Sequence, residues 1–260
     1  MNFAKSSSRI GPVPRWLIAY LCLLTSCINQ DSMLPLPPKT ETSKPPQEIR
    51  YLALGDSYTI GEGEKRENTY PEQVKRILEV EDWAFSNTQI LAKTGWTSGE
   101  LLEATLNQGL KNERFDFVSL LIGVNNQYRG ESPQTFHTDL QDLLDLCRTL
   151  VNGNTNRVAV LSIPDWGVTP FGQNGPQEVG RIAAEIDRFN QIIERETSKR
   201  GMAFLEITES YRSKGGLSAH LVSDGLHPNK YIYSDWARAL APIMKTGILN
   251  DPDQKKPDEK

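Results

Sequence analysis

The sequence predicts an α/β fold in which a parallel sheet carries helices on both faces. Short apolar runs alternate along the chain with longer segments whose apolar residues recur at helical spacing. The apolar runs are mostly continuous, which is typical of strands that are covered on both faces. The chain has 260 residues and is 38% hydrophobic, which suits one domain of about 200 residues with a single core.

Five apolar runs are predicted to form the strands of this sheet, at residues 50–54, 88–92, 117–122, 157–163 and 203–207. Helices are predicted between and after them, within residues 68–78, 98–110, 133–151, 177–199 and 231–249. At the start of the first helix, Thr69 and Glu72 have the spacing of a capping box, and Pro71 fits the first turn. Gly201 follows the predicted end of the fourth helix.

The first 26 residues are predicted to be a secretory signal peptide. Lys5, Arg9 and Arg15 give this segment a basic start, and the apolar stretch WLIAYLCLL follows at residues 16–24. That stretch is too short to span a bilayer easily, which takes about 20 residues, but it suits the apolar core of a signal peptide.

Leu24-Thr25-Ser26-Cys27 resembles the lipobox of bacterial lipoproteins, in which small residues precede an invariant cysteine. The resemblance implies cleavage before Cys27 and acylation of that cysteine. It also implies a lipid-anchored protein of the bacterial cell envelope, facing the periplasm or the cell surface. Stable anchoring needs more than one acyl chain, and the lipoprotein modification supplies several. The alternative is an ordinary signal peptide in which the cysteine stands by chance.

Two segments flank the predicted domain, which covers residues 49–249. Residues 27–48 start with the lipidated Cys27 and are rich in Pro, Ser, Thr and Lys, and we expect them to form an extended tether. Residues 250–260 are predicted to be a charged, disordered tail. With Cys22 removed and Cys27 acylated, Cys147 is left alone, so no disulfide can form within the mature chain. We expect Cys147 to be a small core residue.

Composition argues against two classes of partner. The formal net charge is −4 and the basic residues are scattered, so the electrostatic footprint of a nucleic-acid-binding protein is missing. The three histidines show neither HExxH nor HxH spacing, which argues against a metal centre. His137 and His220 are expected at the surface or in loops. We expect a monomer that binds neither nucleic acid nor metal.

The residues that follow the predicted strands include the parts of a serine-nucleophile site. Carboxyl ends of parallel strands meet at one edge of a sheet, and sites in such folds lie beyond that edge. The residues placed there are Ser57 after the first strand, Gly95 after the second, Asn125 and Asn126 after the third, Trp166 after the fourth, and Asp224 with His227 after the fifth. A serine, an imidazole, a carboxylate, an amide and a glycine backbone are what acyl transfer through a serine requires.

Each of these groups has a defined task in that chemistry. His227 can take the proton of Ser57 with one ring nitrogen, and Asp224, three residues earlier, can hold the other nitrogen. The negative oxygen of the tetrahedral intermediate needs hydrogen-bond donors. The backbone N–H groups of Ser57 and Gly95 and the side-chain amide of Asn125 could supply them.

The set resembles the SGNH (GDSL-type) hydrolase family over roughly residues 49–249. The matching blocks are Gly55-Asp56-Ser57, Gly95 within AKTGWTSGE, Asn125 in a Gly-x-Asn block, and Asp224-Gly225-Leu226-His227-Pro228. The Gly-x-Ser-x-Gly elbow of ordinary α/β-hydrolases is not matched, because Thr59 occupies its last position.

The resemblance implies a flavodoxin-like three-layer α/β/α sandwich with a five-stranded parallel sheet. It also implies hydrolysis of esters or thioesters of lipids, acetylated sugars and other small acyl compounds, without a cofactor. Ser57, His227 and Asp224 would be the catalytic residues, and Ser57, Gly95 and Asn125 would form the oxyanion hole. One residue departs from the family pattern, because Asn126 stands where the third block usually has Asp. Two adjacent amides result, and the choice of Asn125 over Asn126 rests on alignment.

We interpret the chain as a lipid-anchored serine esterase that acts on small acyl or acetyl groups. Two alternatives remain open: an acyltransferase with the same nucleophile, and a non-catalytic domain that binds acyl or glycan ligands. Trp96 and Trp166 directly follow predicted strand ends, so they could line the substrate pocket or cap the edge of the core.

Overall fold

The computed structural model describes residues 48–250, which form a five-stranded, all-parallel sheet in the order β2-β1-β3-β4-β5. The strands are β1 (Ile49–Gly55), β2 (Phe85–Ala92), β3 (Phe117–Leu121), β4 (Val158–Leu161) and β5 (Ala203–Leu205). The order confirms the predicted parallel sheet. Since β1 lies between β2 and β3, the loops after these three strands are neighbours at one edge.

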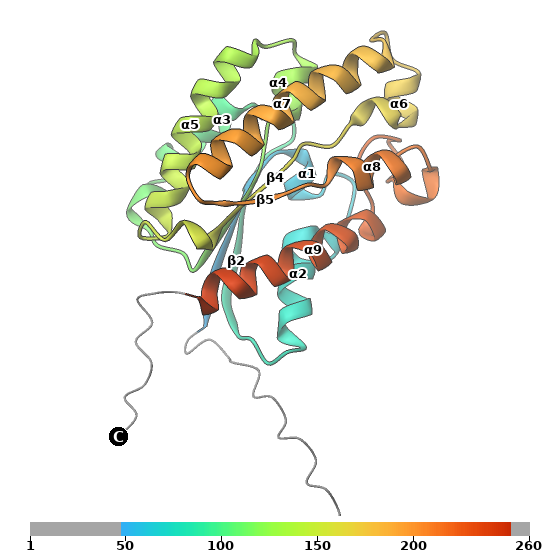
Figure 1. Ribbon diagram of the computed structural model, residues 1–260. Helices are drawn as coiled ribbons and strands as arrows, with labels where there is room; N and C mark the ends of the chain where they lie inside the picture. The colour runs from blue at the N-terminus through green and yellow to red at the C-terminus, as the bar shows by residue number, and fades with distance from the viewer. Residues whose placement is uncertain (1–47, 251–260) are drawn as a thin grey trace, which may run out of the picture. The chain divides into compact units, whose positions relative to one another are not determined.

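Helices cover both faces of the sheet, as Figure 1 shows. The α-helices within residues 48–250 are α1 (Ser57–Ile60), α2 (Tyr70–Glu79), α3 (Ser98–Asn107), α4 (Val124–Tyr128), α5 (Pro133–Leu150), α6 (Pro170–Gln173), α7 (Val179–Lys199), α8 (Thr208–Lys214) and α9 (Lys230–Leu249). On one face α2 packs against α9, and on the other α5 packs against both α3 and α7. The sheet and these two helix layers form the predicted three-layer sandwich.

Burial explains which strands the sequence reveals most clearly. All residues of β3 and β4 are buried, which agrees with their continuous apolar runs. The edge strand β2 begins at Phe85, three residues before its predicted start, and Ser86 and Asn87 in this extension are exposed. These polar residues do not indicate a strand in the sequence. They are tolerated because an edge strand has a free side that faces solvent.

The predicted capping box at α2 is wrong. Thr69 precedes the helix, but its hydroxyl donates to the carbonyl of Arg66 at 2.8 Å and caps no helical N–H. Glu72 instead pairs with the guanidinium of Arg66 at 2.9 Å. A 3₁₀ helix, η1 (Arg66–Asn68), leads directly into α2, and its carbonyl captures the hydroxyl that the sequence assigned to the cap. Pro71 does lie in the first turn.

A capping box does form at the start of α3. Thr97 accepts from the backbone N–H of Glu100, and the Glu100 carboxylate accepts the backbone N–H of Thr97 at 2.8 Å. This cap fixes where α3 begins, directly after the loop that carries Gly95.

One further prediction concerns a residue within 48–250, whereas several others concern residues outside this range. Cys147 is fully buried in α5, as predicted, and burial raises the pKa of its thiol to about 12. The predicted signal peptide, the acylation site Cys27 and nearly all of the predicted tether and tail lie outside the described residues. Within residues 48–250, every helix is too short or too polar to cross a membrane.

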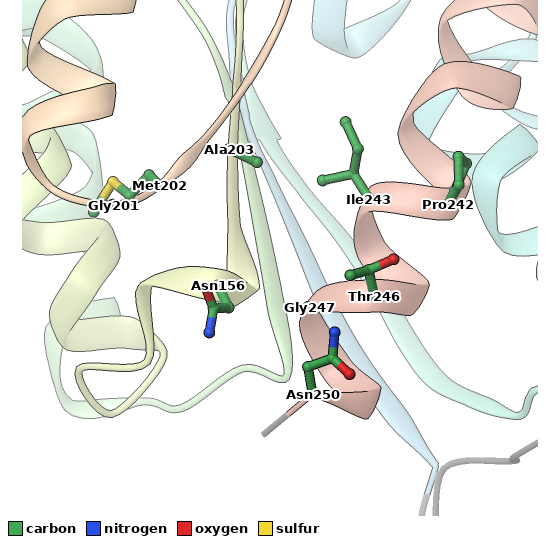
Figure 2. Close-up of a pocket in the computed structure, with 9 residues that line it drawn as sticks. All are labelled: Asn156, Gly201, Met202, Ala203, Pro242, Ile243, Thr246, Gly247 and Asn250. Carbon is green, nitrogen blue, oxygen red and sulfur yellow. The ribbon is translucent and has the colours of Figure 1, made fainter. Parts of the chain in front are cut away.

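A cavity of 480 Å³ lies at the amino-terminal edge of the sheet, where the C-terminal half of α9 faces the segments leading into β4 and β5 (Figure 2). Its walls are mainly apolar and include Met202, Ala203 and Ile243. This edge is opposite the carboxyl ends of the strands, which the sequence marks as the candidate site.

Candidate active site

Ser57 is the first residue of α1, immediately after β1. Asp56 caps this helix by accepting the backbone N–H of Tyr58 at 3.0 Å. A Cβ atom on Gly55 would lie 2.1 Å from the Thr59 hydroxyl oxygen, so the turn packs too closely for a larger residue. The strand end and the cap together hold Ser57 at the sheet edge, where its side chain lines a cavity.

His227 and Asp224 complete a hydrogen-bonded chain with Ser57. The Nε2 atom of His227 lies 2.9 Å from the Oγ atom of Ser57, although the two residues are 170 positions apart in the sequence. On the other side of the ring, Nδ1 lies 2.6 Å from Oδ2 of Asp224. The structure therefore brings the three predicted catalytic residues together in the order that nucleophilic catalysis by serine needs.

The loop that carries His227 is held by its own hydrogen bonds. Oδ1 of Asp224 accepts the backbone N–H groups of Leu226 and His227 at 2.8 and 3.0 Å. The hydroxyl of Tyr211 donates to the carbonyl of Leu226 at 2.6 Å. These bonds fix the ring independently of Ser57.

Electrostatics set the charge of Asp224 and the proton position on His227. Burial acts to raise the pKa of Asp224, but hydrogen bonds from the His227 ring and from the backbone N–H groups of His227 and Leu226 outweigh it. The pKa therefore lies below its ordinary value, and Asp224 is a carboxylate at neutral pH. A carboxylate only accepts hydrogen bonds, so neutral His227 carries its proton on Nδ1. Nε2 is then free to accept the proton of Ser57.

Gly95 and Asn125 line the same cavity as Ser57. Gly95 has a φ of +86°, in the left-handed region that favours glycine, and its carbonyl accepts from the Arg129 guanidinium at 2.5 Å. The amide nitrogen of Asn125 donates to the carbonyl of Trp96 at 2.9 Å and makes a long contact of 3.4 Å with Asp56. That long contact leaves its N–H able to turn to a substrate oxygen. Ser57 is the first helical residue, so its N–H has no acceptor within α1.

The environment of Asn126 differs from that of Asn125. It is fully buried, and its side-chain oxygen accepts the backbone N–H of Ser98 at 3.0 Å. Its amide nitrogen donates to the Ser98 hydroxyl and to the Glu131 carboxylate, both at 2.8 Å. Asn126 therefore ties α4 to the start of α3 rather than facing the cavity. The amide uses both its donor and its acceptor here, which an Asp in the usual family pattern could not do.

The cavity next to Ser57 has a volume of 180 Å³ and mainly apolar walls. Of the two tryptophans predicted as candidate pocket residues, Trp166 lines this cavity, whereas Trp96 packs against the hydrophobic core. The other lining residues are Tyr58, Thr94, Val124, Tyr128, Phe171 and Leu226, besides the site residues already described. Sequence reasoning missed these six. Of the six, Tyr128 was the easiest to predict from the sequence, because it lies one helical turn after Asn125.

A family model for GDSL-like lipases and acylhydrolases matches residues 53–234. The chain belongs to the GDSL-like lipase/acylhydrolase family. The matched segment runs from β1 into α9 and so includes Ser57, Gly95, Asn125, Asp224 and His227. Membership makes the protein an ester-bond hydrolase.

Three solved structures, two of them of esterases by name, have the same fold as this GDSL-like hydrolase. The structure of TesA is 20% identical with a TM-score of 0.60, over 76% of this chain and 98% of that one. The psychrotrophic esterase EstA from a Pseudoalteromonas species is 19% identical with a TM-score of 0.56, over 77% and 98%. The acetylxylan esterase Axe2 from Geobacillus stearothermophilus is 18% identical with a TM-score of 0.57, over 75% and 94%. No curated protein matches the chain.

Asp56 of the Gly55-Asp56-Ser57 block has an unusual pKa for a carboxyl group. It is fully buried behind Ser57, and burial raises its pKa to about 7, although the hydrogen bond from the Tyr58 backbone acts in the opposite direction. Asp56 therefore changes charge near neutral pH, within hydrogen-bonding reach of Asn125.

The remaining histidines lie apart from this site. His137 is in α5 and contacts the buried carboxylate of Glu196 at 3.0 Å. His220 is in the 3₁₀ helix η5 (Ser218–His220). Across residues 48–250, His, Cys, Asp and Glu side chains form no group of three or more that could hold a metal ion.

Proposed function

We propose that this GDSL-like hydrolase is a serine esterase that cleaves small carboxylic esters through an acyl-enzyme intermediate on Ser57. The observation that carries the proposal is the continuous hydrogen-bonded chain from Ser57 through His227 to Asp224, with distances of 2.9 and 2.6 Å. All three residues belong to one chain, so this chain of hydrogen bonds needs no residue from a second copy.

The first half-reaction acylates the enzyme. His227 Nε2 accepts the hydroxyl proton while Oγ of Ser57 bonds to the carbonyl carbon of the ester, and the carbonyl oxygen becomes an oxyanion. The intermediate collapses when the bond between the carbonyl carbon and the alcohol oxygen breaks. The imidazolium of His227 gives its proton to that oxygen, and the alcohol leaves.

The second half-reaction releases the acid. His227 takes a proton from water, whose oxygen bonds to the carbonyl carbon of the acyl-enzyme. The bond to Oγ then breaks, and the proton returns from His227 to Ser57. In both steps Asp224 stabilises the imidazolium. The N–H groups of Ser57 and Gly95 and the Asn125 amide stabilise the oxyanion.

The residues beside Ser57 favour catalysis over simple ligand binding. A binding domain has no need for a serine, a correctly protonated imidazole and a carboxylate in one chain of hydrogen bonds. Transfer of the acyl group to a sugar hydroxyl would use the same residues. Product analysis with and without an acceptor sugar separates a hydrolase from an acyltransferase.

A covalent probe tests the proposed nucleophile. An alkyl fluorophosphonate should lose fluoride and bond through phosphorus to Oγ of Ser57, and peptide mass spectrometry should place the adduct on that residue. Hydrolysis of a 4-nitrophenyl ester should fall in proportion to labelling. An adduct on another residue, or full activity after complete labelling, would contradict the proposal.

We also propose that the enzyme is anchored to the bacterial cell envelope through acylated Cys27. The support is the basic start, the apolar stretch and the lipobox-like Leu24-Thr25-Ser26-Cys27 of the sequence. The Cys27→Ala variant should move from the membrane fraction to the soluble fraction and keep its specific activity. A wild-type protein found in the soluble fraction would favour the plain signal peptide.

A further inference from the structure

Three aromatic rings form one wall of the cavity beside Ser57. The ring centroids of Tyr128 and Trp166 lie 5.2 Å apart, those of Trp166 and Phe171 lie 6.0 Å apart, and Tyr128 and Phe171 are 6.4 Å apart. Tyr128 and Phe171 are partly exposed at the rim, whereas Trp166 is only 3% exposed. Trp166 is therefore the inner member of this aromatic wall, and its position sets the depth of the cavity.

The buried side chain of Gln127 holds the indole of Trp166 in place. The indole Nε1–H donates to Oε1 of Gln127 at 2.7 Å. The amide nitrogen of Gln127 donates to Oε2 of Glu185 at 2.9 Å, and the other oxygen of Glu185 pairs with Arg181 at 2.7 Å. Gln127 itself is 2% exposed.

A side-chain amide satisfies both neighbours of Gln127, because it carries a donor and an acceptor. The indole is a donor without acceptor capacity, so the group facing it must accept. The Glu185 carboxylate accepts only, and its pKa is lowered by hydrogen bonds from Arg181 and Gln127, so the group facing it must donate. The amide orientation is fixed by these two partners. A carboxylate at position 127 would repel Glu185, and an apolar side chain would leave the indole N–H without its acceptor.

We propose that Gln127 is a positioning residue that fixes Trp166 as the inner wall of an acyl pocket, and that this pocket selects short apolar acyl chains such as butyryl over acetyl. The proposal rests on the proposed serine esterase function. Val124 and Tyr128 share α4 with the oxyanion donor Asn125, so the chain next to the bound carbonyl meets apolar side chains first.

The size and chemistry of the cavity support this class of acyl group. A volume of 180 Å³ is small beside the roughly 300–1,000 Å³ of pockets that hold drug-sized ligands, so the cavity suits a short acyl chain. The lining is mainly aromatic and aliphatic away from the catalytic residues, which favours an apolar chain over a hydroxylated one. A displaced indole would take away this contact surface and leave the triad intact.

A double-mutant cycle tests the role of Gln127. The kcat/KM values for 4-nitrophenyl butyrate and 4-nitrophenyl acetate are measured for the wild type, Gln127→Met, Trp166→Phe and the double variant. Gln141→Met is the matched control, because Gln141 also donates to a carboxylate, that of Glu196, in the α5 layer. Acetates of ethanol and hexanol report on the alcohol side.

We expect Gln127→Met to lower the butyrate-to-acetate ratio of kcat/KM about tenfold, which corresponds to one lost buried hydrogen bond. It should leave the acetate value within about twofold of wild type. In the Trp166→Phe background, Gln127→Met should change the ratio little, because the indole N–H that Gln127 accepts is absent. Gln141→Met should leave the ratio unchanged.

Several results would overturn the role of Gln127. An unchanged ratio in Gln127→Met, equal losses on both esters, the same effect in the Trp166→Phe background, or a change that follows the alcohol would each do so. If Gln127→Met does not fold, the part-exposed Glu185→Gln, which lets the Gln127 amide turn, should lower the ratio in the same direction. A wild type that hydrolyses none of these esters would instead contradict the proposed function.

Discussion

Oδ2 of Asp224 lies 2.6 Å from Nδ1 of His227, while Oδ1 of the same carboxylate accepts two backbone N–H groups from its own loop. The carboxylate is thus fixed before it orients the ring. This arrangement determines which nitrogen of His227 faces Ser57 as a base.

Asp224→Asn should lower kcat for an aryl ester by about 10⁴-fold with little change in KM. The Asn amide can donate to Nδ1, which stabilises the tautomer that carries its proton on Nε2 and so removes the base. Steady-state kinetics at pH 7.5 check this. Asp235→Asn, which removes a carboxylate paired with Lys214, is the matched control and should retain activity. A kcat within tenfold of wild type for Asp224→Asn would contradict the assigned role.

Substituting the adjacent amides at positions 125 and 126 should have different effects, one on kcat and the other on the free energy of unfolding. Asn125→Ala should lower kcat by about 10²–10³-fold at nearly unchanged stability, because its amide faces the cavity. Asn126→Ala should lower the free energy of unfolding by about 1–3 kcal/mol, because it leaves the buried Ser98 N–H without its acceptor. Kinetics and urea denaturation of both variants measure the contrast. A larger loss of kcat in folded Asn126→Ala would reverse the two assignments.

Asp56 should make the free energy of unfolding fall as the pH rises, which is opposite to the usual effect of a carboxyl group with a lowered pKa. Its pKa is about 7 in the folded protein, against 3.8 in a solvent-exposed chain. Between these values the folded state binds more protons than the unfolded state, so the free energy of unfolding falls as the pH rises. This contribution is fully present below about pH 4 and is lost as the pH passes through 7.

Urea denaturation from pH 5 to pH 8 tests this dependence. Relative to Asp56→Asn, which keeps an acceptor for the Tyr58 N–H, the wild type should lose about 2–3 kcal/mol over this range. Other titrating groups are common to both proteins and cancel in the comparison. Parallel curves for the two proteins would show that Asp56 does not titrate there.

The sequence could predict the catalytic chain because its residues stand at strand ends. Each buried strand is a continuous apolar run, and parallel pairing then places Ser57, Asn125 and the residues after β5 at one edge without further information. The pairing of Asp224 with His227 followed from a spacing of three residues in one loop.

The walls of the pocket could not be predicted in the same way. Tyr128 and Phe171 belong to α4 and α6, helices of five and four residues, which are too short to show a hydrophobic period. Trp96 and Trp166 look alike in sequence, since both follow a strand. Only the packing of their loops makes Trp166 a buried residue that lines the cavity and leaves Trp96 partly buried against the core. Gln127 gave no signal, because a buried amide between two distant partners leaves no local pattern.

Ser57→Ala tests the central claim most directly, through the rate at which the folded variant hydrolyses a short-chain 4-nitrophenyl ester. We predict a fall of about 10⁶-fold in kcat, to near the rate without enzyme, with an unchanged circular dichroism spectrum. Activity of the folded Ser57→Ala variant within a hundredfold of wild type would contradict the assignment of Ser57 as the nucleophile.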